Sequence, residues 1–327
     1  MKLKLHTQNT ETLQTTLSII GQLRKFVILQ FSREQLLIIL AEPLSATKEP
    51  QIWCKLNINS VFDQVEIQSL RDNVILLEAN TDILLQTLRN FDKANSEGLY
   101  IRLQKKDGSK GQGSSSSGRL ASLALFYSTM NMNDNQINHT FRVPVRVLRK
   151  GDDEVVLKEP ALKRVDMMIR LPKEFASIYK RLEKFKKTSN SEMIEIQCSK
   201  ERGGFLGFVL EEEGKYKVTI SWNEKLDIRV PQNSESDEES LRFINASTNG
   251  ARNDDGDSQT AQNEYNGIVV KLRDWNLTSK IVATCKNVIL LLANNEACVL
   301  HCLLRESNDV EIMYYINGTR NGEIGVS

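Results

Sequence analysis

Short apolar segments recur along this chain, most with the alternation of β-strands and a few with the spacing of helices. In the first half, helices are expected near Glu11–Arg24 and over about Asp82–Lys93, the second with Thr81 as its N-cap. Strands are expected near residues 2–6, 26–31, 35–40, 51–57, 64–69, 74–79, 98–104, 119–127 and 137–143.

The same order of elements begins again after residue 164. A strand over Val165–Leu171 is followed by Pro172 and by a third helix, and a fourth helix is expected near residues 274–285. The apolar stripe of the third helix consists of Phe175, Ile178, Leu182 and Phe185. Further strands are expected near residues 192–198, 205–211, 214–222, 225–230, 267–273, 286–293, 296–304 and 310–316.

The two halves therefore have the same composition of elements. Each contains about nine strands and two helices, arranged as two β-α-β-β-β units. Short sequences repeat as well, in Arg24–Leu29, Arg71–Leu76 and Cys285–Leu290. Many strands with few helices predict an α+β fold, in which the helices cover one face of antiparallel sheet.

Three irregular segments divide the chain. Residues 105–118 are rich in Gly, Ser and Lys, which is typical of a flexible loop, and residues 144–164 form a charged connector. Residues 231–265 are polar, acidic and poor in aromatic residues, so we expect them to be disordered. We therefore predict domains at residues 1–143 and 165–327, joined by the connector.

The charged residues are unevenly distributed along the chain, and the composition disfavours several classes of protein. The formal net charge is +1, but residues 231–265 contain eight acidic and two basic residues (−6), so the remainder carries about +7. Five widely spread cysteines without a CxxC pair predict buried, reduced thiols. No signal peptide and no apolar segment of membrane-spanning length is present, so we expect a cytosolic or nuclear protein without a membrane role.

At this point the order of elements resembles the PCNA-like sliding clamps. Leu171–Ile178, running into the third helix, is similar to the start of the second domain in that family, and Ser279-Lys280 and Val310–Ile316 are similar to its C-terminal region. Met1–Leu5 and Trp53-Cys54 resemble the Hus-type subunit of the nine-one-one DNA-damage checkpoint clamp, and the long inserts resemble its fungal mitotic-entry-checkpoint form. Together these short matches cover nearly the whole chain outside the inserts.

The resemblance implies a scaffold and not an enzyme. The expected assembly is a heterotrimeric ring with sheets outside and helices lining a hole that encircles double-stranded DNA at damage sites. The implied partners are two related clamp subunits, an ATP-dependent clamp loader and the checkpoint kinase machinery, in the nucleus. No cofactor, no metal and no catalytic residue are expected.

A basic face on the third helix is the physical basis for DNA contact. At 100° per residue, Lys180, Lys184 and Lys187 lie opposite the apolar stripe and Arg181 lies on its flank. Lysine and arginine contacts to phosphate carry no base sequence information, as sliding requires. From this helix alone, the alternative is an ordinary solvated face. The other candidate pore residues are Arg89, Lys93 and Lys280. The first helix departs from the family's basic pattern, since it has Gln14, Ser18 and Gln22 where lysines are usual.

Two strands are candidates for subunit edges, because edge strands that pair across an interface satisfy their backbone groups. The resemblance assigns this role to residues 137–143 and 214–222, although either could be an interior strand. In each strand, alternate positions share one face and are the candidate interface residues: Ile137, His139, Phe141 and Val143 in the first, and Tyr216, Val218 and Ile220 in the second. A partner-peptide pocket is expected at Leu40, Val147 and Tyr315.

Other chemistry receives little support from the residues. Gly113–Gly118 lacks the lysine and following Ser/Thr of a phosphate-binding loop. Cys298 and Cys302 share one strand face while His301 points away, which disfavours a zinc site. Ser258-Gln259 matches the minimal site of checkpoint-type kinases, so Ser258 is a candidate phosphorylation site. The alternative functions are a β-rich protein-interaction module without DNA binding and an enzyme with an unrecognised site.

Overall fold

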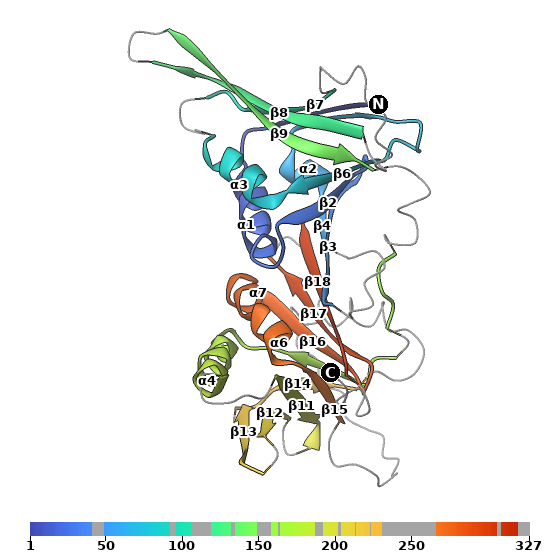
Figure 1. The fold of residues 1–327 in the computed structure, drawn as a ribbon, viewed down its shortest axis with the longest axis vertical. Helices are drawn as coiled ribbons and strands as arrows, with labels where there is room; N and C mark the ends of the chain where they lie inside the picture. Colours follow the sequence, from blue (N-terminus) through green and yellow to red (C-terminus); the bar gives the residue numbers. More distant parts are fainter. Residues whose placement is uncertain are drawn as a thin grey trace, which may run out of the picture. The chain divides into compact units, whose positions relative to one another are not determined.

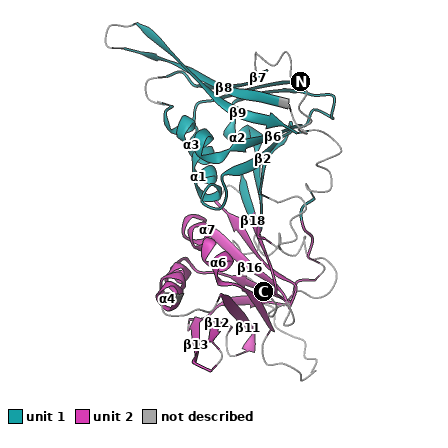
Figure 2. Ribbon diagram, viewed as in Figure 1, with its two compact units in different colours: residues 1–47, 51–159, 307–312 teal, residues 48–50, 160–306, 313–327 magenta. Residues whose placement is uncertain are grey.

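The chain divides into two compact units. The computed structural model describes residues 1–40, 49–91, 96–105, 119–131, 135–148, 158–162, 164–186, 192–201, 204–212, 214–222, 224–230, 266–305 and 309–319. Unit 1 comprises residues 1–47, 51–159 and 307–312, and unit 2 comprises residues 48–50, 160–306 and 313–327 (Figure 2).

Unit 1 is built on antiparallel sheet. Its strands follow the order β4-β3-β2-β6-β9-β8-β7-β1-β5. They are β1 Lys2–Thr7, β2 Phe26–Phe31, β3 Gln35–Leu40, β4 Gln51–Asn57, β5 Gln64–Gln68, β6 Ile75–Asn80, β7 Leu99–Lys105, β8 Arg119–Met130 and β9 Gln136–Val147. The nine strands expected in this half are therefore confirmed.

Helices α1 (Glu11–Ile20) and α3 (Thr81–Arg89) pack together on one face of this sheet (Figure 1), and a short α2 (Ile58–Val61) follows β4. On the helix-covered face, Leu29 and Leu77 lie opposite each other in β2 and β6 and are 2% and 0% exposed. The next positions, Ile28 and Glu78, point to the other face and are half-buried. The period of two thus separates a core face from an outer face.

The strands and helices of the second half repeat this plan. The strands are β10 Met167–Arg170, β11 Met193–Ser199, β12 Phe205–Glu212, β13 Tyr216–Trp222, β14 Asp227–Arg229, β15 Asn266–Lys271, β16 Asn287–Ala293, β17 Ala297–Leu303 and β18 Val310–Asn317. Strands β13-β12-β11-β15 form a separate four-stranded sheet, while β14-β10-β16-β17-β18 are neighbours in the larger one. The helices are η1 (Lys173–Phe175), α4 (Ala176–Lys186), α6 (Leu272–Leu277) and α7 (Ser279–Thr284).

An aromatic cluster forms the core of unit 2. Phe175, the last residue of η1, lies 5.9 Å from both Phe208 of β12 and Trp222 of β13, measured between ring centroids. Trp275 of α6 stacks on Tyr179 of α4 at 5.8 Å. Burying side chains of this size contributes about 1.5–3 kcal/mol each, so the cluster joins the α4 and α6 helices to the four-stranded sheet.

Several elements differ from their predicted bounds. The helix expected at residues 274–285 is two short helices, because the Thr278 backbone N–H bonds three residues back to the Trp275 carbonyl at 3.0 Å, and the Thr278 hydroxyl donates to the same carbonyl at 2.6 Å. Strand β9 continues past Val143 to Val147. Pro144 is tolerated inside it because its pairing is with Ser122 of β8, and the pairing with β6 begins only at Val145.

The N-cap of α3 is Asn80 and not the predicted Thr81. The Asn80 side-chain oxygen accepts from the Ile83 backbone N–H at 3.1 Å. Thr81 is fully buried, and its methyl group lies beside Gly21 at the end of α1. The side chain of Thr81 therefore serves the packing between the two helices, which leaves the preceding residue to cap the helix.

Replacing Asn80 tests this assignment. Asn80→Ala should lower the free energy of unfolding by about 1 kcal/mol, because one backbone N–H at the start of α3 loses its acceptor. Urea denaturation of the full chain measures the change. Asn80→Asp keeps the acceptor and should leave stability within about 0.5 kcal/mol. Equal losses of stability in the two variants would contradict the assignment of Asn80 as the N-cap of α3.

Candidate nucleic-acid interface and subunit edges

Helix α4 has one buried and one basic side. Phe175, Ile178 and Leu182 are 0–1% exposed. Lys180, Arg181 and Lys184 are exposed, together with the acidic Glu183. The helical spacing predicted both sides, and the structure places three cations on the solvent side. Lys187, the fourth predicted cation, lies outside the described residues.

A buried pair of hydroxyl groups holds α4 in this orientation. The Tyr179 hydroxyl lies 2.6 Å from the Thr278 hydroxyl between α6 and α7. Thr278 donates its own hydrogen to the Trp275 carbonyl, so Tyr179 must be the donor of the shared bond. Burial raises the pKa of Tyr179 well above its usual range, which keeps this donor protonated. The bond ties α4 to the neighbouring helices and leaves its cations outward.

Tyr179 was not singled out from the sequence, although a signal was present. It follows Phe175 by four residues, the spacing that puts two side chains on one helix face. Its partner Thr278 is 99 residues away in sequence. Only the packing of α4 with α7 brings the two hydroxyl groups together.

The other basic residues expected on helices are fewer in each helix and differ in exposure. Arg89 is exposed in the last turn of α3 in unit 1, and Lys280 is half-buried in α7 in unit 2. Lys93 lies outside the described residues. Unit 2 therefore carries most of the exposed positive charge that the structure describes on helices.

Helix α1 carries no basic side chain, and its one charged residue is the exposed, acidic Glu11. The Gln14 side chain donates to the Thr10 hydroxyl at 2.7 Å and to the Leu88 carbonyl at 3.0 Å, so it joins α1 to α3. The Ser18 hydroxyl bonds back to the Thr15 carbonyl. Gln22 is exposed just beyond the helix. Two of the three residues that stand in place of lysines thus have structural partners.

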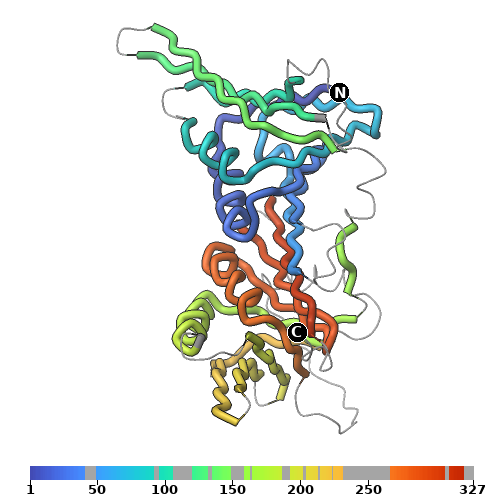
Figure 3. Tube along the Cα trace, in the orientation of Figure 1, coloured from blue at the N-terminus to red at the C-terminus, as the bar shows by residue number. Residues whose placement is uncertain are grey.

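Strand β9 has an open edge along its first part. On one side, residues 136–147 pair with β8, while on the other side only residues 145–147 pair with β6. The β8–β9 hairpin continues beyond these neighbours (Figure 3). Ile137 is 45% exposed there, and His139 stacks on Tyr127 at 4.6 Å. Phe141 is half-buried and Val143 is fully buried.

Strand β13 is the terminal strand of the four-stranded sheet. Its inward positions are Tyr216 and Val218, half-buried, and Ile220, 7% exposed. The alternate positions Lys217 and Thr219 are exposed. Both strands proposed from the sequence therefore have an unpaired edge among the described residues, which is what pairing with another chain requires.

Two of the three residues expected to form a peptide pocket lie in unit 1 and the third lies in unit 2. Leu40 in β3 is buried, and Val147 in β9 is half-buried. Strands β2 and β6 lie between β3 and β9, so the two residues are separated by about 14 Å of sheet. Tyr315 is buried in unit 2.

The described residues contain no group of three side chains able to hold a metal ion. All five cysteines are buried as thiols. Burial raises the pKa of the Cys298 thiol to about 12, so it is not a thiolate at neutral pH. In the part of the chain that the structure describes, no helix is long and apolar enough to cross a membrane. Gly113–Gly118 and Ser258 lie outside the described residues.

Comparison with known proteins identifies relatives over nearly the whole length. The family model described as "Hus1-like protein" matches residues 1–320. The DNA damage checkpoint control protein MEC3 of Eremothecium gossypii is 25% identical, covering 93% of each chain. MEC3 of Saccharomyces cerevisiae and the checkpoint protein hus1 of Schizosaccharomyces pombe are 23% and 24% identical, each covering 97% of this chain and 99% of the relative.

Solved structures show the same fold. Proliferating cellular nuclear antigen from Entamoeba histolytica matches with a TM-score of 0.61 at 11% identity, covering 97% of this chain and 99% of that one. PCNA from Thermococcus kodakaraensis matches with a TM-score of 0.58 at 10% identity, covering 97% and 100%. The α+β fold predicted from the order of elements is therefore confirmed as the PCNA-like clamp fold.

The hydroxyl pair that orients α4 can be tested by removing one oxygen. Tyr179→Phe should lower the free energy of unfolding by about 1 kcal/mol, because a buried hydrogen bond is lost. The matched control is Tyr216→Phe, since the buried Tyr216 hydroxyl has no hydrogen-bond partner among the described residues. Urea denaturation should show no loss for the control. An equal loss in both variants would assign the effect to ring packing.

Proposed function

The chain belongs to the family of Hus1-like proteins, and we propose that it acts as a non-catalytic subunit of a heterotrimeric checkpoint sliding clamp that encircles DNA. One observation carries the DNA-binding part of this proposal. The exposed cations Lys180, Arg181 and Lys184 lie on a helix whose opposite side is buried in an aromatic core. A rigid helix with outward cations suits contact with the phosphate backbone.

The contact would be independent of base sequence. Lysine and arginine bound to phosphate oxygens position a protein on DNA but carry no sequence information, so a subunit can move along the duplex. Because α1 has no basic side chain, few phosphates would be contacted. Binding would then be weak and salt-dependent, and the closed ring would keep the protein on DNA. The other pore residues in this proposal are Arg89, Lys93, Lys187 and Lys280.

Two related subunits would complete the ring through the open edges of β9 and β13. Backbone pairing satisfies the unpaired N–H and C=O groups of both strands. Exposed Ile137 and half-buried Phe141, Tyr216 and Val218 would be covered by the partners. In this proposal the domains are residues 1–143 and 165–327, and an ATP-dependent loader opens the ring.

As a scaffold, the protein would bind the checkpoint kinase machinery at damaged DNA in the nucleus. The names of the relatives, DNA damage checkpoint control protein and checkpoint protein, support this role. Partner peptides would bind near Leu40, Val147 and Tyr315, and Ser258 would be phosphorylated. These assignments rest on the family resemblance and not on a described cavity.

Charge reversal on α4 tests the DNA contact. In the assembled clamp, Lys180→Glu with Lys184→Glu should weaken binding to a closed circular duplex at least ten-fold at low salt, since two phosphate contacts become repulsive. The matched control reverses Lys200 and Lys225, two exposed lysines of unit 2 outside α4. Retention of the clamp on the circle, followed by sedimentation, is the measurement. Unchanged retention of the α4 variant would contradict DNA contact by this helix.

Assembly through β9 has its own test. Ile137→Asp should prevent formation of a 1:1:1 complex with the two related subunits, because burying an unpaired carboxylate on the edge costs several kcal/mol. The control is Met130→Asp, which changes a 60%-exposed apolar residue of β8 in the same hairpin. Native mass spectrometry distinguishes the trimer from smaller species. A normal trimer with Ile137→Asp would exclude this edge as an interface.

A further inference from the structure

The outer face of unit 1, opposite the helix-covered face, carries a row of aromatic side chains. His6, Tyr100 and Phe126 are direct cross-strand partners in β1, β7 and β8. The rings of Tyr100 and Phe126 are stacked, with centroids 5.3 Å apart and planes 10° from parallel. His6 is buried beside Tyr100, with ring centroids 4.5 Å apart, whereas Tyr100 is 38% exposed. Tyr100 therefore lies between His6 and Phe126 in this row, and part of its ring faces solvent.

A row of cations lies next to the aromatic row. Lys4, Arg102, Ala124 and Arg142 are cross-strand partners in β1, β7, β8 and β9, so the cations extend over about 14 Å. The Arg102 guanidinium lies over the Phe126 ring, 4.7 Å from its centroid. We define the basic–aromatic face as Lys4, Tyr100, Arg102, Phe126 and Arg142.

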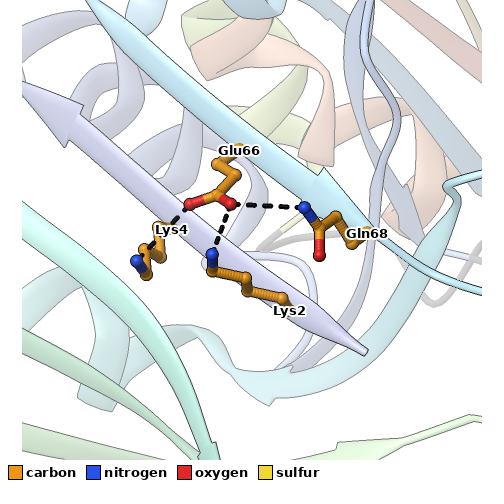
Figure 4. A network of polar contacts seen from close by, with 4 residues as sticks. All are labelled: Lys2, Lys4, Glu66 and Gln68. Atoms are coloured by element: carbon orange, nitrogen blue, oxygen red, sulfur yellow. Dashed lines mark hydrogen bonds and ion pairs between the residues drawn. The ribbon is translucent and has the colours of Figure 1, made fainter.

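The charge on this face is unbalanced. Glu66 is its one acidic residue among the described positions of β5, β1, β7, β8 and β9. It interacts with Lys2, with Lys4 at 3.4 Å and with the Gln68 amide at 3.3 Å (Figure 4). The hydrogen bond from Lys2 lowers the pKa of Glu66, which keeps it ionised. With Asp63, which lies 3.7 Å from His6, and the ion pair of Arg146 with Glu78 of β6 included, five positive charges (Lys2, Lys4, Arg102, Arg142, Arg146) face three negative ones (Asp63, Glu66, Glu78), a net +2.

This arrangement is unfavourable for the isolated chain. Lys4 and Arg102 are directly opposite each other in adjacent strands, and like charges in that position destabilise a sheet. Neither Arg102 nor Arg142 forms an ion pair with a residue that the structure describes. A bound anion would relieve the repulsion. The exposed ring of Tyr100 indicates that the same ligand also offers a flat apolar group.

We propose that the basic–aromatic face binds single-stranded DNA, by packing of bases against the exposed part of the Tyr100 ring and by contact of phosphates with Lys4, Arg102 and Arg142. Aromatic side chains beside cations on an open surface are the usual means of holding single strands without sequence preference. A duplex hides the faces of its bases. A peptide is commonly held in a groove or along a strand edge, and this face lies within the sheet. The choice of DNA over RNA rests on the proposed function.

The test uses the full chain alone, which cannot encircle DNA without its partners, and a fluorescent oligothymidine of about 15 nucleotides. Fluorescence anisotropy gives the dissociation constant at several salt concentrations. With three phosphate contacts, a plot of log K against log salt should have a slope of about −2. Tyr100→Ala should weaken binding about five-fold through loss of this aromatic contact, and Tyr100→Phe should bind nearly as the natural chain does.

Arg102 has a matched control on the same strand. Arg102→Ala should make the salt slope shallower by about 0.7. Lys105→Ala removes the same charge from β7 but from its opposite face, and should leave the slope unchanged. Thermal unfolding checks that the variants remain folded. Equal effects of both substitutions would overturn the inference in favour of general electrostatic attraction.

Two further outcomes separate this surface from α4 and from a protein partner. If the Lys180→Glu, Lys184→Glu chain loses the oligonucleotide while Tyr100→Ala retains it, the inference is wrong and the proposed function stands. If a phosphorylated acidic peptide binds in a Tyr100-dependent way and oligothymidine does not bind, the surface recognises protein and the inference is also wrong. Loss of oligothymidine binding with Tyr100→Ala alone, in a chain that still assembles and stays on circular duplex, supports a separate site.

Discussion

The exposed charge on α4 depends on the burial of its other side. Phe175 and Tyr179 are buried among Phe208, Trp222 and Trp275, so rotating α4 would expose aromatic surface worth several kcal/mol. The hydrogen bond from Tyr179 to Thr278 adds direction, because its two oxygens come from different helices. The lysines on the solvent side need no specific partner to stay there. Their position follows from the core.

A second constraint is that the backbone N–H and C=O groups of every strand need hydrogen-bond partners. Strand β9 is paired on both sides only near its end, and β13 is paired on one side. Unpaired strand edges invite pairing with another chain. Two such edges, one in each unit, fit a subunit that meets a neighbour through each unit.

In the unit 1 sheet, successive residues of each strand point to opposite faces, so one face forms the core and the other can carry a binding surface. Inward positions such as Leu77 and Val145 form the core beneath α1 and α3. Outward positions on neighbouring strands bring together Tyr100, Arg102 and Arg142, which are up to 42 residues apart in the sequence. Strand register, and not local sequence, creates the basic–aromatic face. For this reason the basic–aromatic face does not correspond to any run of charged residues in the sequence.

The sequence by itself determined the strands and their order, because apolar periodicity and punctuation by residues such as Pro172 act locally. It also determined which side of α4 carries Lys180 and Lys184, since helical phase fixes that. Only the tertiary structure decided that Asn80 caps α3, because Thr81 was needed in the packing against α1. The donor role of Tyr179, the open edge of β9 and the separation of Leu40 from Val147 were likewise decided by strand pairing and helix contacts between residues distant in the chain, which no local pattern encodes.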